Sequence, residues 1–425
     1  MLMAKKRRSC LAFCSFCLIF ADTIFTNNHV SFMKDFQFYA PTEVQFGQHS
    51  EEMVAQLVKK YGGTKVLLHY GGQSAKRSGL LDKICGLLRQ GGVEFVELGG
   101  VVPNPRLSKV HEGIALCREQ GVDFILAVGG GSVIDSSKAI AYGVPYEGEV
   151  WDFYLGKATP ASCLPVACVL TIPAAGSEMS EASVITNEDG DVKLGYSNNI
   201  SRPKFAIMNP ERTFSLPAYQ TAAGVTDIMM HTMERYFNPD GDMTITDAIA
   251  EALMRTMKQC VFEVLKNPED YRNRAQIMWA GSLAHNDVTG NRTNGDWATH
   301  QIEHELSAMF DVTHGAGLAV VWPSWARYVM KENVSRFVRF AVNVAGVEND
   351  YTDPEATALR GIAAIERFYH AIGMPNSIHE LIGRDITDAE IDEMARKCTR
   401  GGTITQGKFK VLKTEDIAAI YRMAR

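Results

Sequence analysis

The sequence predicts two domains, an N-terminal α/β domain and a C-terminal all-helical domain. The chain has 425 residues, which is more than one hydrophobic core usually organises. From about residue 50 to 215, helix-like and strand-like segments alternate, as in a parallel sheet covered on both faces. After Leu216-Pro217, long segments with a 3.6-residue period replace the β-branched runs. We therefore expect domains at 33–216 and 217–425, preceded by an extension at 1–32.

Short apolar runs that stop at glycine turns predict strands, and amphipathic stretches between them predict helices. Alternating aromatic and apolar residues at 36–38 and 44–46 suggest two opening strands with Pro41 between them. The further expected strands are residues 65–70, 94–98, 123–128, 166–171, 182–186 and 205–208. The expected helices of this domain are residues 51–61, 80–89, 107–120 and 132–141.

The second domain consists of segments rich in Ala, Met, Glu and Arg. The expected helices are residues 218–237, 246–265, 271–285 and 297–310, with three or four more to the C-terminus. Small-molecule sites favour the interface between such domains. We expect the functional site there.

Composition excludes several classes of protein. The net charge is −6 and no Lys/Arg stripe interleaved with aromatic residues is present, so we expect no nucleic-acid partner. The six cysteines beyond residue 32 are scattered without a CxxC pair. That pattern favours neither a disulfide framework nor a thiolate zinc site, and it fits a reducing compartment.

The first 32 residues do not fit that picture. Residues 5–8 are basic and residues 10–25 are mostly apolar, which resembles a secretory signal. The apolar run is too short and interrupted to span a bilayer. Met33 begins a segment typical of the start of a folded domain. We expect translation to start at Met33 and the protein to be cytoplasmic and free of membranes; genuine export is the alternative.

A glycine-rich turn follows the strand expected at 123–128. Gly129, Gly130, Gly131 and Ser132 lead into a helix that carries Asp135 and Lys138. Glycines let backbone amides approach a phosphate, and the helix N-terminus adds unpaired N–H groups. The turn is therefore a candidate pyrophosphate site, although a purely steric role for its glycines also explains them.

A second turn, Gly71-Gly72-Gln73-Ser74, follows the strand at 65–70. NAD-selective sites often place a carboxylate near such a strand end to hold the ribose hydroxyl. Here there is none, and Lys76 and Arg77 follow Ser74. We expect NADP(H), with NAD(H) as the alternative. Solvated surface positions for Lys76 and Arg77 are the competing interpretation.

Five of the eleven histidines lie between residues 231 and 314. Asp227 and His231 are spaced i,i+4 on one helix face, and His300 and His304 repeat that spacing. Imidazoles and a carboxylate suit a divalent metal such as Fe²⁺ or Zn²⁺. A continuous helix would separate His300 from His314 by roughly 21 Å. His314 is therefore a possible ligand only if the helix stops near residue 310, and spacing alone does not choose between His304 and His314. The remaining histidines, His285 among them, fit ordinary hydrogen-bonded positions.

Together these motifs resemble the iron-containing (group III) alcohol dehydrogenase family, from about Met33 to the C-terminus. They are the glycine turn at 129–132 with Asp135 and Lys138, Gly224-x-x-Asp227-x-x-x-His231, and His300-x-x-x-His304 with His314-Gly315-x-Gly317. The resemblance implies that Asp227, His231, His300 and His314 are the metal ligands. It places His304 near the nicotinamide and substrate as a catalytic residue. It places four further residues along the cofactor cleft: Asn104, Thr171, Ser177 and Lys193.

The likeness is greatest to the NADPH-dependent butanol dehydrogenase branch, although Gln73 stands where that branch has a glycine. The resemblance implies a Rossmann-like dinucleotide-binding domain, a helical metal domain, and hydride transfer between NAD(P)H and a short-chain aldehyde or primary alcohol. We also expect a homo-oligomer, a dimer. The same architecture resembles glycerol dehydrogenases and dehydroquinate synthase-like lyases. A lyase of that kind needs several basic residues at its substrate, and the helical-domain motifs carry no such Lys/Arg cluster.

Overall fold

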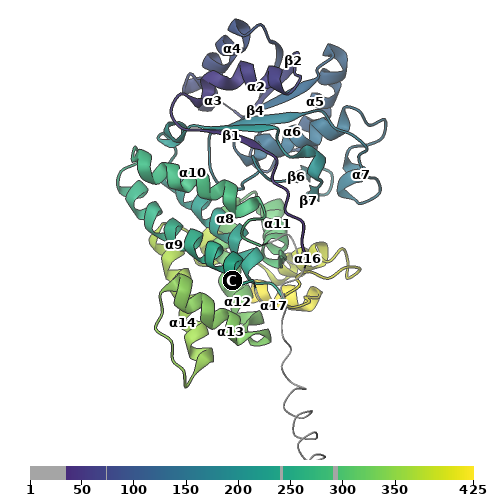
Figure 1. The fold of residues 1–425 in the computed structure, drawn as a ribbon. Helices are drawn as coiled ribbons and strands as arrows, with labels where there is room; N and C mark the ends of the chain where they lie inside the picture. The colour runs from purple at the N-terminus through teal and green to yellow at the C-terminus, as the bar shows by residue number, and fades with distance from the viewer. Residues whose placement is uncertain (1–34, 73, 240–242, 291–294) are drawn as a thin grey trace, which may run out of the picture.

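The computed structural model describes residues 35–72, 74–239, 243–290 and 295–425. The extension predicted at 1–32 and the start at Met33 lie outside these ranges. In Figure 1 a sheet with its covering helices occupies the upper part of the molecule, and a helical region occupies the lower part. The predicted order of an α/β domain followed by a helical domain is confirmed.

The larger sheet has six strands in the order β1-β8-β5-β4-β2-β3, and every neighbouring pair is parallel. Every residue of β4 is buried, as expected for a central strand covered on both faces. The strands are β1 (Glu43–Phe46), β2 (Lys65–Tyr70), β3 (Glu94–Leu98), β4 (Phe124–Gly129), β5 (Val166–Leu170) and β8 (Phe205–Met208).

Alternate strand residues pack into cores on opposite faces of the sheet. Val66 and Leu68 of β2 share a core with α2 and α4, whereas Leu67 packs with α5 and α6 on the other face. The helices are α2 (Val54–Lys60), α3 (Ser74–Arg77), α4 (Leu80–Gln90), α5 (Leu107–Gln120), α6 (Gly131–Gly143) and α7 (Trp151–Tyr154).

One expected strand is absent from this region, and two expected elements are present in a modified form. Residues 36–38 form no strand, so the domain opens with β1 alone. The helix expected at 51–61 begins as a 3₁₀ turn, Ser50–Met53. The strand expected at 182–186 belongs to a separate antiparallel hairpin of β6 (Ala182–Asn187) and β7 (Val192–Ser197). β7 was not predicted because its sequence, VKLGYS, contains a lysine and a glycine and has no apolar run.

The helical region shares one large apolar core. After α11, six α-helices follow within the described residues, more than the three or four expected, because short helices break up the C-terminal segment. The helices are α8 (Ala218–Tyr236), α9 (Thr244–Lys266), α10 (Tyr271–His285), α11 (Ala298–Phe310), α12 (His314–Val329), α13 (Val334–Phe340), α14 (Pro354–Ala371), α15 (Ile378–Ile382), α16 (Asp388–Cys398) and α17 (Thr414–Ala424). Among the described helices, none is long and apolar enough to cross a membrane.

The two regions meet at the carboxyl ends of the parallel strands. Residues just after β2, β4 and β5 line the same cavity as residues of α8 and α11. Open α/β sheets bind ligands at this edge. Because β8 ends at Met208 and α8 begins at Ala218, we propose 216/217 as the domain boundary.

Candidate metal centre and cofactor cleft

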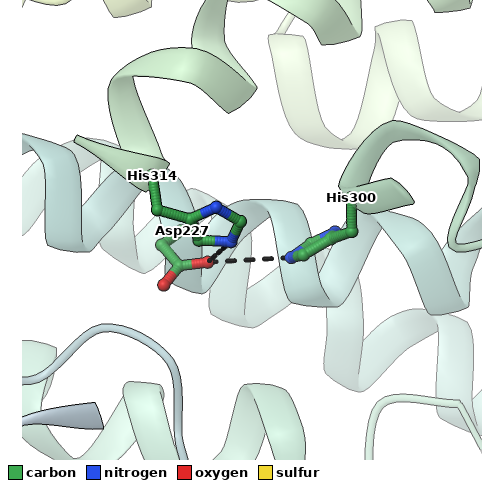
Figure 2. Close-up of side chains that lie close together, drawn as sticks. All are labelled: Asp227, His300 and His314. Atoms are coloured by element: carbon green, nitrogen blue, oxygen red, sulfur yellow. Dashed lines mark ion pairs between the residues drawn. The ribbon is translucent and has the colours of Figure 1, made fainter. Parts of the chain in front are cut away.

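Three helices bring three ligand-type side chains together at the bottom of the cleft. Asp227 lies in α8, His300 in α11, and His314 is the first residue of α12. Asp227 Oδ1 lies 3.8 Å from His300 Nε2 and 3.8 Å from His314 Nε2. Figure 2 shows both rings pointing toward the carboxylate from separate segments. One ligand atom from each residue lies within 4.8 Å of the others.

The chain reversal between α11 and α12 makes this grouping possible. α11 ends at Phe310, and Asp311 takes a left-handed conformation with φ 50° as its C-cap. The helix thus stops near residue 310, and His314, the first residue of α12, lies close to His300. A Cβ on Gly315 would lie 2.1 Å from the Ala223 carbonyl oxygen, so only glycine lets α12 pack this closely on α8.

The other two candidate histidines lie beside this group. The His231 ring centroid is 4.5 Å from that of His300, but its Nδ1 donates to the Asp227 backbone carbonyl at 3.0 Å. His304 lies next to His314, with its ring centroid 5.6 Å from that of His314. Its Nδ1 is buried and has no hydrogen-bond partner within the described chain. His304 also belongs to a second possible group of ligands, with Glu303 and His314.

The donor atoms fit a divalent cation. Asp227 Oδ1 and His300 Nε2 are both buried and make no well-directed hydrogen bond in the part of the chain described, although His231 Nδ1 lies 3.0 Å from Asp227 Oδ1 as an ion-pair contact. Orphaned polar atoms of this kind are costly unless a further group satisfies them. Burial opposes ionisation of Asp227, but the facing His231, His300 and His314 hold the pKa of its carboxyl well below the usual range. A carboxylate oxygen and imidazole nitrogens are ligands for iron-type metals.

Two glutamates hold the histidine rings in place from behind. His300 Nδ1 donates to Glu234 Oε1 at 2.9 Å, and His314 Nδ1 donates to Glu303. Each bond fixes the proton on Nδ1 and leaves Nε2 directed at Asp227. Such outer carboxylates orient metal-binding histidines and raise their basicity.

All sixteen predicted site residues line one cavity of about 870 Å³. Eleven of them belong to the α/β domain and its hairpin, and the other five are the aspartate and histidines of the helical region. These lining residues are Gly71, Gly72, Ser74, Asn104, Gly130, Gly131, Ser132, Asp135, Thr171, Ser177, Lys193, Asp227, His231, His300, His304 and His314.

Several of these residues brace the walls of the cleft. Asp135 is buried and accepts hydrogen bonds from Ser177 Oγ at 2.5 Å and the Val184 amide at 2.9 Å. Lys193 Nζ lies 3.8 Å from Glu303 Oε2, so β7 contacts the helix that carries His300. These contacts tie the loop after β5 and the hairpin to the site.

Two other contacts shape the cleft, one at its rim and one at the start of α6. Asn104 donates to Asp311 Oδ1 at 2.9 Å across the mouth. A Cβ on Gly130 would lie 2.1 Å from Ile172 Cγ2, which explains the glycine at the start of α6. Lys76 does not line the cleft; its ammonium lies 5.2 Å from the Tyr70 ring centroid.

Comparison with known proteins identifies the family. A model described as iron-containing alcohol dehydrogenase matches residues 41–210, and one for the C-terminal part of the same family matches residues 221–425. The chain belongs to the iron-containing alcohol dehydrogenase family. The probable NADH-dependent butanol dehydrogenase 1 of Bacillus subtilis is 41% identical, over 92% of this chain and 99% of that protein.

Further relatives support the same assignment. The NADPH-dependent aldehyde reductase of Escherichia coli K12 is 32% identical, over 92% of this chain and 100% of its own. A crystal structure of NADH-dependent butanol dehydrogenase A from Thermotoga maritima superposes with a TM-score of 0.88 at 38% identity, covering 92% of this chain and 99% of that one. As a member of this family, the chain is a metal-dependent oxidoreductase that transfers hydride between NAD(P)H and an alcohol or aldehyde.

Sequence reasoning missed three residues of the site in this alcohol dehydrogenase. Glu234 and Glu303 bond His300 and His314, which lie on other helices, so no spacing along the sequence points to these two glutamates. His285 was interpreted as an ordinary histidine, but it lines the cleft with its ring centroid 4.2 Å from that of His231. Burial and the neighbouring His231 and Arg235 hold its pKa well below the usual value.

Glu303→Gln is expected to weaken metal binding about 10- to 100-fold, because the charge behind His314 is lost while the shape is kept. Glu305→Gln is the matched control, since Glu305 lies on the same helix and makes no hydrogen bond to these histidines among the described residues. The metal dissociation constant, measured by competition with a chelating dye, checks this. Equal constants for the two variants would show that Glu303 does not support His314.

Proposed function

We propose that this enzyme interconverts short-chain aldehydes, butanal among them, and primary alcohols, using one divalent metal held by Asp227, His231, His300 and His314. The observation that carries the proposal is the pair of orphaned ligand atoms, Asp227 Oδ1 and His300 Nε2, at the floor of the cleft. His231 completes the set if its ring turns away from its own helix carbonyl. Fe²⁺ and Zn²⁺ both accept this donor set.

A metal bound there would polarise the aldehyde oxygen and stabilise the developing alkoxide. The residues around the metal would orient the substrate and transfer a proton. His304 has an unpartnered, buried Nδ1 in the cleft wall, so we assign it the proton transfer to or from the substrate oxygen. Burial and the nearby Lys193 lower the pKa of His304 well below its usual value, which favours the neutral ring.

The dinucleotide is proposed to lie along the strand ends. β4 runs into Gly130, and α6 begins at Gly131, so the amides of Gly131 and Ser132 are available for the pyrophosphate. Gly71, Gly72 and Ser74 would face the adenosine ribose. The nicotinamide half is assigned to the stretch lined by Asn104, Asp135, Thr171, Ser177 and Lys193.

The test uses metal-depleted enzyme, reconstituted under anaerobic conditions with Fe²⁺ or Zn²⁺. We expect butanal-dependent oxidation of NAD(P)H to return in proportion to bound metal, up to one equivalent per chain. Full activity in the metal-free protein would contradict the proposal.

We propose NADPH as the preferred cofactor. No carboxylate lies among the cleft-lining residues between 71 and 105, so none there repels a 2′-phosphate. Lys76 supports this less than expected, because its ammonium packs on Tyr70. The relatives differ in cofactor: the Bacillus subtilis protein at 41% identity is named for NADH, and the Escherichia coli protein at 32% identity is named for NADPH.

We expect kcat/KM to favour NADPH over NADH by about three- to tenfold, the effect of one or two modest hydrogen bonds. Ser74→Asp is expected to reverse the ratio, because a carboxylate there repels the phosphate and binds the ribose hydroxyls. Ser74→Asn, of similar size and uncharged, is the control. Equal values or an NADH advantage in the unaltered enzyme would show that this argument is wrong.

We also propose a homodimer in the cytoplasm. Edge strand β1 exposes Phe46, which is 41% exposed and lies 6.3 Å from the 39% exposed Trp279 ring; Phe36 and Phe38, in the segment before β1, are 46% and 49% exposed. Exposed apolar patches beside a sheet edge favour association. The six cysteines in the described residues are all unpaired, which suits a reducing compartment. Light scattering of the purified protein tests the dimer.

A further inference from the structure

His285 is the last residue of α10 and is half-buried in the wall of the cleft. Its ring centroid lies 4.2 Å from that of His231 and 5.7 Å from that of Trp297. The proposed reaction gives this ring no role. One ring nitrogen of His285 has no hydrogen-bond partner in the described part of the fold, and the ring lies beside the proposed metal ligand His231. We therefore ask what this nitrogen could bind.

One nitrogen of His285 is already committed. Nδ1 lies 2.7 Å from the Ala175 carbonyl oxygen, and since a carbonyl only accepts, Nδ1 carries the hydrogen. The neutral ring then has a lone pair on Nε2. No hydrogen-bond partner for Nε2 exists among the described residues.

The orientation of the ring is fixed by tight packing. The loop that carries Ala175 turns at Gly176, which has φ +64°. A Cβ there would lie 2.6 Å from the Gly281 carbonyl oxygen of α10 and 2.6 Å from His285 Cβ. The Ala175 loop therefore packs directly against α10. The His285 ring cannot rotate away without breaking its hydrogen bond to the Ala175 carbonyl.

The nearby Arg235 guanidinium makes its contacts with groups other than His285 Nε2. The Arg235 guanidinium lies over the Trp297 ring at 4.7 Å, donates to the His231 carbonyl at 3.0 Å, and lies 3.6 Å from Asp287 Oδ1. Asp287 in turn accepts from Arg202 at 2.7 Å. On this wall, Nε2 of His285 is thus an acceptor that the protein itself leaves unused.

We propose that His285 is a specificity-determining residue: its Nε2 accepts a hydrogen bond from a second hydroxyl on a small primary alcohol whose reacting oxygen lies at Asp227, His300 and His314. This inference rests on the proposed function. The His285 ring lies 4.2 Å from that of His231, and the His231 ring lies 4.5 Å from that of His300, so His285 is separated from the ligand group by a single side chain. An acceptor in the cleft wall that a bound substrate would cover favours a hydroxylated substrate over its deoxy analogue, because an unpaired acceptor is then costly.

The test compares kcat/KM for 1,4-butanediol with that for 1-butanol in the unaltered enzyme and in three variants. In His285→Asn, the side-chain amide can still donate to Ala175 but has no atom at the Nε2 position. His285→Gln places an amide near the Nε2 position, and His285→Phe removes both polar atoms. We expect the diol-to-monoalcohol ratio to fall about tenfold in the Asn and Phe variants and by less than about threefold in the Gln variant.

An unchanged ratio in the Asn and Phe variants would overturn this proposal and leave the proposed function standing. Equal losses with both alcohols, together with a raised KM for the cofactor, would assign Nε2 to the nicotinamide carboxamide and also overturn it. A loss of bound metal in the Asn variant would show a structural role instead. If the unaltered enzyme oxidises neither alcohol, the proposed function itself is wrong.

Discussion

Replacing His314 by alanine is expected to lower bound metal below detection and to reduce kcat/KM for butanal by about a thousandfold or more. His314 is held between the Asp227 carboxylate in front, at 3.8 Å, and Glu303 behind. Removing the ring takes one ligand from the cluster and leaves the Glu303 carboxylate buried without its partner. Metal content by plasma mass spectrometry and steady-state kinetics check both effects.

His304→Ala is the matched comparison. His304 lies on the same side of the cleft, but its unpartnered Nδ1 is proposed to move a proton rather than to hold the metal. We expect this variant to retain about one equivalent of metal and to lose turnover. If His304→Ala empties the site and His314→Ala does not, the ion is bound by the group of Glu303, His304 and His314, and the assignment is wrong.

Lys138→Met is expected to raise the cofactor dissociation constant about a hundredfold and to lower the melting temperature by several degrees. The ammonium of Lys138 is fully buried and donates to the carbonyls of Ser177, Ser180 and Ala182 at 2.8, 2.9 and 2.8 Å. It also faces the buried Asp135 carboxylate. Removing it leaves these acceptors unpaired and Asp135 uncompensated, which is strongly destabilising.

Cofactor binding measured by NADPH fluorescence, with thermal melting in parallel, tests this effect. Lys266→Met serves as the control, since the Lys266 side chain on α9 is 70% exposed and pairs only with Glu263. Unaltered cofactor affinity in Lys138→Met would show that the loop after β5 keeps its shape without the ammonium.

The parallel sheet was predictable from the sequence because its central strands are buried on both faces. β2 and β8 were predicted at their observed bounds, and β4 within one residue at each end. The hairpin strand β7 was not, since a half-exposed strand with a lysine and a glycine is defined by its pairing with β6 rather than by its own composition.

The metal group was only partly predictable. The i,i+4 spacing found Asp227 and His231 because both lie on one helix. The choice between His304 and His314 depended on the chain reversal at Asp311, which is a tertiary feature. The contact of Glu234 with His300 joins helices 66 residues apart in the sequence, and spacing within a helix cannot show it.

The cofactor turn shows the same limit. Ser74 lines the cleft as predicted, but Lys76, two residues later, packs on Tyr70. The two side chains are close in sequence and leave a four-residue helix, Ser74–Arg77, in different directions.

The central claim is that a single divalent metal is held by Asp227, His231, His300 and His314. Anomalous diffraction at the iron edge, from crystals of the Fe²⁺-loaded enzyme, tests it most directly. We expect one peak about 2.0–2.2 Å from an Asp227 oxygen and from one nitrogen of each of the three histidines. A peak bound instead by Glu303 and His304, or no peak within reach of Asp227, would contradict the claim.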